Sequence, residues 1–415
     1  MIHIEGLGPI WLVVAILAAT VVVAIVAGRS AIPASVGLVV VGLVVAVFGP
    51  DVRNPISPDL LLAIVLPGLV FEAAFRTDLA VLRPSATAVL LLAVPGVVIV
   101  AAIVAFVLTV TTILSPAEGF LVGAMVAATD PAAVLSTFRH VPVPRRLATI
   151  VEMESLVNDG TGIVLFALAL DVLAGDGSLG GSLLGFVVKV AGGGALGLAA
   201  GWLAARVVRR VDDHLTELTI TVVLAYGTYL AAEAIGLSGV IATLVAAASF
   251  GSLARGALSR AAVEAIDVVW EFAAFLLTAG VFLIVGLSIA PEALVAAAGA
   301  IGWGIAAILV ARAAVVYGLL GGGSALVRRM AGRPRGGELE PRDEPIPPAW
   351  LHVVFWAGLR GAVSVALALS LPADLANRDL LQGLTFGIVL FTLFVQGSTA
   401  GWVVRRSGSA APDPA

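Results

Sequence analysis

This sequence has no cysteine and few charged residues. Only 12% of its 415 residues are Asp, Glu, Lys or Arg, whereas 60% are hydrophobic. Such a chain has too few polar side chains to cover a soluble globule, so the composition predicts an all-α polytopic membrane protein. The lack of cysteine excludes disulfides and thiolate metal sites.

Histidine is also scarce, with four residues in the chain. Three of them lie outside the apolar runs and the fourth stands only at the start of one: His3, His140, His214 and His352. Neither paired zinc ligands nor a serine supported by histidine is visible, which disfavours a membrane-embedded hydrolase. We therefore expect a protein that is not an enzyme, has no cofactor and binds no nucleic acid.

Apolar runs separated by Pro, Gly and charged residues predict about thirteen membrane spans. Their approximate extents are 9–28, 32–50, 58–75, 85–114, 116–138, 146–173, 181–207, 215–235, 238–254, 265–289, 293–320, 349–372 and 379–404. The first run is long enough to be a span instead of a cleaved leader. The Gly-, Pro- and charge-rich stretch 321–348 predicts a cytoplasmic loop, and 405–415 a cytoplasmic tail.

Arginine supports this count independently. With the N-terminus outside and the C-terminus inside, the predicted external loops carry only Arg53 and Arg378. The loop arginines on the cytoplasmic side are Arg29, Arg76, Arg83, Arg139, Arg145, Arg146, Arg206, Arg209, Arg210, Arg255, Arg260, Arg328, Arg329, Arg333, Arg335, Arg342, Arg405 and Arg406. Such one-sided placement is typical of a multi-pass protein, and a count wrong by one span would destroy it.

The sixth span contains charge where hydrocarbon is expected, in the run Glu152-Met153-Glu154-Ser155-Leu156-Val157-Asn158-Asp159. A charge at that depth costs several kcal/mol and usually marks an ion, proton or substrate pathway. Ser155 and Asp159 share one helix face, with Glu154 and Asn158 on the adjacent face. Oxygen ligands of this kind suit Na⁺ or Li⁺. The alternative is that these polar residues only hold helices together.

Two further spans carry a predicted interruption. Thr129-Asp130-Pro131 stands in the middle of span 5, and Arg360 lies between Gly358 and Gly361 in span 12. Spans seven apart cross the membrane in opposite directions, so two broken helices of opposite sense predict an inverted-repeat transporter with its site at the midplane. Asp130 and Arg360 are available to compensate the helix dipoles there.

The remaining buried charges need partners. Arg312, in the middle of span 11, is best matched by Glu154. Glu72 in span 3 is placed to line a cytoplasmic funnel or to hydrogen-bond Asn158. Glu271 is expected at the membrane interface, and Lys189 is expected to reach towards the external one.

These strings together resemble the cation:proton antiporter family, in the branch with prokaryotic sodium/proton antiporters and animal sodium/proton exchangers. The matching strings are LPGLVFEAAF around Glu72, ATDPAAVLS around Asp130, ESLVNDGTGIVLF around Asp159, WEFAAFLLTAGVFLIVGL in span 10 and WAGLRGAVSVALALSLP in span 12, together with the lone Arg312. The sequence departs from the family at Thr278, where Asn is frequent, and at Ala357, where Gly is frequent.

The resemblance implies a homodimer in which spans 5 and 12 are broken and cross. Residues 1–404 would form one transport unit, with a core domain near 85–173 and 293–404 and a dimerisation domain from the other spans. Asp159 would bind cation or proton in turn, with Thr129 and Ser155 helping to hold the ion. Asn158 would be oriented by Glu72. The pairs Glu154–Arg312 and Asp130–Arg360 would stabilise the core.

Taken together, the sequence predicts a plasma-membrane protein that exchanges Na⁺ or Li⁺ for H⁺ by alternating access. Because one carboxylate exchanges one charge for another, the expected stoichiometry is electroneutral, 1:1. Potassium/proton exchange and a passive cation channel remain the alternatives. The lipid bilayer, the two cations and a second copy of the chain are the expected partners.

Overall fold

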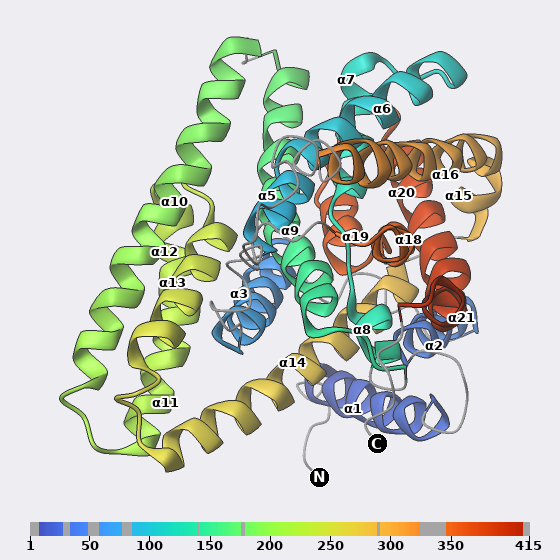
Figure 1. The fold of residues 1–415 in the computed structure, drawn as a ribbon. Helices are drawn as coiled ribbons and strands as arrows, with labels where there is room; N and C mark the ends of the chain where they lie inside the picture. Colours follow the sequence, from blue (N-terminus) through green and yellow to red (C-terminus); the bar gives the residue numbers. More distant parts are fainter. Residues whose placement is uncertain are drawn as a thin grey trace.

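The computed structural model describes residues 8–27, 34–48, 58–76, 85–138, 141–175, 179–288, 291–323 and 346–409. The regular secondary structure of this part of the chain is all helical, without strands (Figure 1). Most of the predicted loop 321–348 and the end of the tail 405–415 lie outside these ranges, as does Arg53. The expectation of an all-α polytopic membrane protein is confirmed.

The helices follow the predicted apolar runs closely. Their bounds are α1 (Gly8–Ala27), α2 (Ala34–Phe48), α3 (Pro58–Arg76), α5 (Ala86–Ala93), α6 (Pro95–Thr111), α7 (Pro116–Ala127), α8 (Ala132–Phe138), α9 (Arg145–Leu173), α10 (Leu179–Val208), α11 (His214–Val222), α12 (Thr228–Ala234), α13 (Gly239–Ala254), α14 (Arg260–Ser288), α15 (Pro291–Ala296), α16 (Ala298–Ala313), α18 (Pro348–Trp356), α19 (Ala362–Leu369), α20 (Arg378–Phe391) and α21 (Ser398–Ser407). Eight helical segments in the described ranges are long and apolar enough to cross a membrane.

Local sequence explains several helix ends. Ser115 accepts a hydrogen bond from the backbone N–H of Glu118 while the Glu118 carboxylate accepts from the N–H of Ser115, a capping box that begins α7. Pro95 occupies the first turn of α6 and divides the predicted run 85–114 into two pieces. Within the described ranges, π-helical segments interrupt longer helices at Val223–Gly227, Ala314–Gly321 and Thr392–Gly397.

Two groups of helices dominate the packing. In one, α10 packs on α13, α13 on α3, and α14 on both α2 and α3. In the other, α7 packs on α6 and α9, α16 on α6 and α20, and α19 on α20. In Figure 1, α10 and α13 lie on one side of the molecule, with α16 and α20 on the other. Gly42 and Gly286 let α2 and α14 meet backbone to backbone, because a Cβ on either would overlap the other helix.

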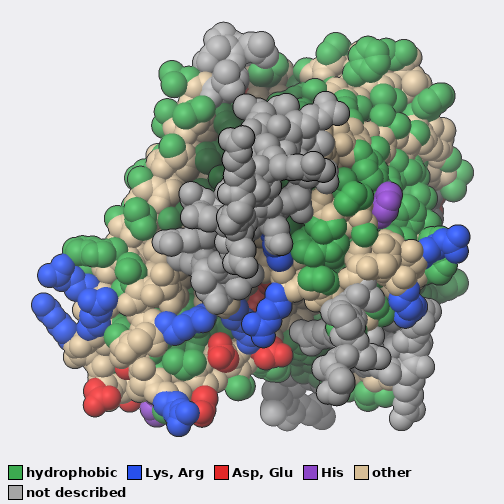
Figure 2. All heavy atoms as spheres, in the orientation of Figure 1, with side chains coloured by type: hydrophobic (Ala, Val, Ile, Leu, Met, Phe, Trp, Pro, Cys, Tyr) green, Lys and Arg blue, Asp and Glu red, His purple; other side chains and the backbone are tan. Residues whose placement is uncertain are grey.

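The surface has the polarity of a membrane protein. Large apolar side chains stand outward, among them Phe106, Val110 and Ile113, each at least 70% exposed. Figure 2 shows hydrophobic side chains over much of the visible face and charged ones gathered near one end, around the α10–α11 turn and the start of α14. An outer surface of this kind matches a hydrocarbon environment and not water.

Candidate functional site

The first predicted interruption is present between α7 and α8. α7 ends at Ala127, Ala128 is extended with ψ 137°, and the three residues Thr129–Pro131 are not helical. Pro131 explains the break, because it has no backbone N–H and disfavours helical geometry in the residue before it. The backbone N–H groups of Thr129 and Asp130 are therefore released from helix bonding and take partners outside their own helix.

The second interruption lies between α18 and α19, and it contacts the first. Residues 357–361 leave the helix, and the carbonyl oxygen of Leu359 accepts a hydrogen bond of 2.8 Å from the backbone N–H of Asp130. Gly361 is needed for this approach, because a Cβ there would overlap the Asp130 carboxylate. This one hydrogen bond satisfies a backbone N–H of the first interruption and a backbone carbonyl of the second.

Arg360 neutralises the open end of α7. Its Nη1 donates to the carbonyl oxygens of Ala127 and Ala128, the latter at 3.0 Å, and its side chain is almost fully buried. Its backbone N–H donates to Thr392 Oγ1 at 3.0 Å, at the start of a π-helical turn. A guanidinium at the carbonyl end of a helix compensates the negative end of the helix dipole.

The predicted ion pair between Asp130 and Arg360 is wrong in its direct form. Asp130 Oδ1 accepts from the backbone N–H of Ala132 at 3.0 Å, in the first turn of α8. The N–H of Ala362, which opens α19, also interacts with this carboxylate. Asp130 therefore serves helix N-termini while Arg360 serves a C-terminus, so each residue compensates a dipole without touching the other.

Thr129 is held by two side chains of α9. Asn158 accepts from the Thr129 N–H at 3.0 Å and donates through Nδ2 to Thr129 Oγ1 at 2.7 Å, while Ser155 Oγ donates to the Thr129 carbonyl. The expected orientation of Asn158 by Glu72 is wrong. Glu72 pairs instead with Arg76 on its own helix at 3.1 Å, and Arg76 also reaches the exposed Glu271 at 3.3 Å.

The predicted pair of Glu154 and Arg312 is formed as an ion pair. Both guanidinium nitrogens donate to the carboxylate, one of them at 3.0 Å, and Nη2 also donates to the carbonyl of Val354 at 2.7 Å. Glu154 is 2% exposed and Arg312 4%. The two charges cancel inside the protein, so neither is available to a transported ion.

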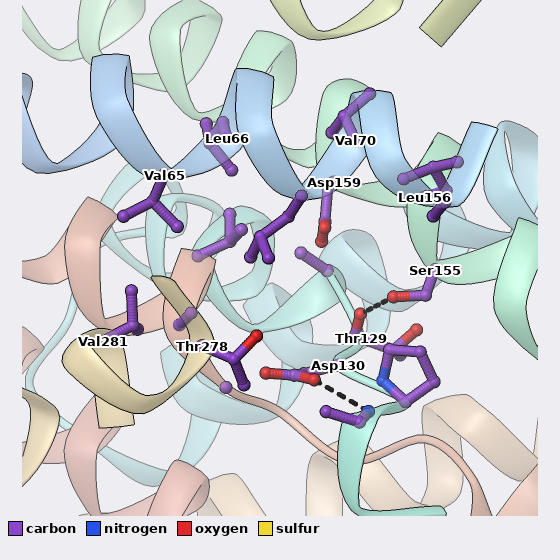
Figure 3. A pocket seen from close by; sticks show the side chains of 18 of the residues that line it. Val65, Leu66, Val70, Thr129, Asp130, Ser155, Leu156, Asp159, Thr278 and Val281 are labelled. Atoms are coloured by element: carbon purple, nitrogen blue, oxygen red, sulfur yellow. Dashed lines mark hydrogen bonds between the residues drawn. The ribbon is translucent and has the colours of Figure 1, made fainter. Parts of the chain in front are cut away.

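Asp159 is placed differently. It lines a cavity of about 200 Å³, together with Thr129, Asp130 and Ser155 (Figure 3). Within the described part of the chain its carboxylate has no hydrogen bond and no ion pair. A cavity of this size has room for a cation with part of its water shell. The structure thus gathers the predicted residues Asp159, Ser155 and Thr129 at one hollow, with Asn158 behind Thr129.

Further polar residues line this cavity that the sequence interpretation did not assign to it, among them Glu152 and Thr278. Glu152 lies two helical turns before Asp159 on α9, and Thr278 comes from α14. The seven-residue spacing of Glu152 and Asp159 puts both on one helix face, a sequence signal that could have found Glu152. For Thr278, the only sequence signal was that the family frequently has Asn at this position.

A polytopic helical membrane protein with two interrupted helices meeting beside a buried carboxylate cavity is the class that this fold and site define. The chain belongs to the sodium/hydrogen exchanger family, since residues 14–406 match the family described as "Sodium/hydrogen exchanger, transmembrane".

Two relatives agree with that membership, and a solved structure shares the fold. The chain is 35% identical over 404 residues to the Na⁺/H⁺ antiporter NhaS2 of Synechocystis, covering 97% of this chain and 71% of the relative. It is 36% identical over 384 residues to the Na⁺/H⁺ antiporter ApNhaP of Aphanothece halophytica, covering 91% and 70%. The sodium proton antiporter MjNhaP1 of Methanocaldococcus jannaschii superposes with a TM-score of 0.72 at 20% identity, over 96% of this chain and 98% of that one. This last likeness concerns the fold.

Proposed function

We propose that the protein exchanges Na⁺ for H⁺ across the membrane, with Asp159 as the group that binds each in turn. The observation that carries the proposal is the contrast between two acids of α9. Glu154 is neutralised by Arg312, whereas Asp159 faces the cavity without a partner in the described ranges. The relatives named Na⁺/H⁺ antiporters support the choice of ions.

Competition at one carboxylate couples the two ions. A bare carboxylate is costly in a desolvated site, so it holds a proton when no cation is present and releases it when a cation binds. Ser155 Oγ and the released main chain of Thr129 supply further oxygens beside Asp159. Such ligands suit Na⁺ or Li⁺, and K⁺ remains the alternative cation.

We further propose that the site is exposed alternately to the two sides. Thirteen spans in inverted repeats, with the interruptions of α7–α8 and α18–α19 crossing near the midplane, would supply the scaffold for it. The helices in residues 85–173 and 293–404 would form the core that carries the site, and the others the dimerisation domain. The cavity would open to the cytoplasm in this conformation, because Glu72 and Glu152 line it near the predicted cytoplasmic ends of their spans.

Three finer features belong to the same proposal. One cation replaces one proton at one carboxylate, so exchange is electroneutral. The protein works as a homodimer in the plasma membrane, with its N-terminus outside and its C-terminus in the cytoplasm. The one-sided placement of arginine supports this orientation.

The test uses liposomes that contain the purified protein and an internal pH dye, with Na⁺, Li⁺ or K⁺ added outside. We expect cation-dependent alkalinisation of the interior, unchanged when the voltage is clamped and lost in Asp159→Asn. Asp171→Asn is the matched control, because Asp171 is an exposed acid on the same helix α9, and it should transport like the parent protein.

Each other outcome contradicts one part of the proposal. Proton movement that persists in Asp159→Asn would remove Asp159 from the chemistry. Proton movement with no cation present would indicate a passive channel. Turnover that changes with the clamped voltage would refute electroneutral exchange.

A further inference from the structure

The largely apolar wall of the cavity that α3 and α14 form carries a hydroxyl group that the proposed mechanism does not use. The wall contributed by α3 and α14 consists largely of Val65, Leu66, Val70, Val281 and Phe282. Glu72 stands on the same wall but is paired with Arg76. Thr278 is the other polar side chain there among the described residues (Figure 3).

The hydroxyl of Thr278 is free in a setting where threonine normally is not. A helical threonine usually donates its hydroxyl to the carbonyl three or four residues earlier. Thr111, Thr219 and Thr399 do this in the same structure. Thr278 makes no hydrogen bond in the described part of the chain, although it lies inside the helix α14. Its donor and acceptor are therefore available to whatever occupies the cavity.

The surroundings of this hydroxyl favour a cation. Figure 3 shows the Thr278 oxygen directed at the side of the cavity where the Asp130 carboxylate lies, with Asp159 in the same hollow. Asp130 uses Oδ1 to cap α8. Oxygen atoms from three separate elements, α9, the α7–α8 interruption and α14, thus converge on one space. Hard cations bind to such sets of oxygen atoms, whereas an apolar solute would form no favourable contact with them.

We propose that Thr278 is a further cation-contacting residue, whose hydroxyl binds the transported Na⁺ or Li⁺ directly or through one of the ion's water molecules. The inference rests on the proposed exchange function and adds a residue to its site. It also assigns that residue to the opposite wall from Asp159, Ser155 and Thr129.

This placement makes the contact dependent on the side from which the ion enters. α14 packs on α2 and α3, whereas α9 packs on α7. If alternating access shifts these two groups of helices past each other, Thr278 contacts the ion in one facing state and is separated from it in the other. Its hydroxyl then strengthens ion binding on the face to which the cavity now opens, and leaves the other face unchanged.

The experiment compares Thr278→Val, which keeps the shape and removes the hydroxyl, with Thr278→Ser, which keeps the hydroxyl. Thr111→Val makes the same chemical change outside the cavity and is the matched control. Inside-out and right-side-out membrane vesicles give KM for Na⁺ and Li⁺ at each face, with the maximal rate. A neutral polar contact of this kind changes binding about three- to tenfold.

We expect Thr278→Val to raise KM by that factor at one face only, with the maximal rate preserved, and Thr278→Ser and Thr111→Val to behave as the parent. An unchanged KM, a rise equal at both faces, or a lower maximal rate without a change in KM would overturn the inference. If Thr278→Val does not assemble, Thr278→Ala is the second hydroxyl-free variant and the same outcomes apply. Failure of the parent protein to exchange cations for protons would refute the function itself, which separates the two results.

Discussion

Removing the buried guanidinium of Arg312 should strongly destabilise the protein. In Arg312→Met, the carboxylate of Glu154 would stay 2% exposed without any of the partners that the structure gives it. The carbonyl of Val354 would lose its donor as well. Leaving one member of a buried pair uncompensated costs about 3–5 kcal/mol in proteins.

Glu154→Gln should be milder, because the amide oxygen can still accept from Arg312 and the Val354 contact survives. The double variant with Gln at 154 and Met at 312 removes both charges. We expect it to recover part of the loss, with a coupling energy of about 1–3 kcal/mol between the two positions.

The assay is a thermal melt of the four purified proteins in one detergent, with the yield of monodisperse protein as a second readout. Arg312→Met should melt lowest and the double variant above it. Additive effects of the two substitutions, or a double variant that melts below Arg312→Met, would refute the view that the pair acts by mutual charge compensation.

Two further predictions concern the site. Gly361→Ala should lower cation exchange at least tenfold and the melting temperature with it, because the new methyl overlaps the Asp130 carboxylate and costs about 1–3 kcal/mol; transport in liposomes at the parental rate would contradict this. Asn158→Leu keeps a branched side chain of the same length but breaks both hydrogen bonds to Thr129. KM for Na⁺ should therefore rise by about tenfold, as loss of about 1–1.5 kcal/mol implies. An unaltered KM would show that Thr129 needs no support.

The helical interruptions could be predicted from sequence because their causes are local. Proline after Asp130 cannot continue a helix, and glycines on both sides of Arg360 make a helix there weak. The pairing of Glu154 with Arg312 could also be predicted, since two opposite charges at similar depth in a membrane have few other ways to be neutralised. Both inferences needed depth and spacing alone.

The partners of Arg360 and Asn158 could not be predicted in the same way. A guanidinium is satisfied by carbonyl oxygens as well as by a carboxylate, and only the three-dimensional position of the α7 terminus makes Ala127 and Ala128 its acceptors. Asn158 likewise had several acceptors and donors within reach. Glu72 pairs with Arg76, four residues later on the same helix. The i,i+4 spacing favours this local pair over a contact between helices.

Thr278 shows a different limit. A threonine within an apolar helix usually satisfies itself by bonding to its own backbone, so the sequence gives no reason to place its hydroxyl in a cavity. That placement depends on how α14 is rotated against α3, which is decided by close contacts such as the meeting of Gly42 with Gly286. The rotation of a helix about its axis is determined by packing against its neighbours, so it cannot be predicted from the residues of that helix alone.

The hydrogen bond between Asp130 and Leu359 has a consequence for how the molecule can move. It joins two loops whose exposed N–H and C=O groups would otherwise face an interior without water, and Arg360 fastens the same two loops a second time. Pulling them apart would leave several polar groups unsatisfied at once, at a cost of several kcal/mol for each. In the proposed transport cycle the two interruptions would therefore move together as one rigid body, with the hinges in other parts of the molecule.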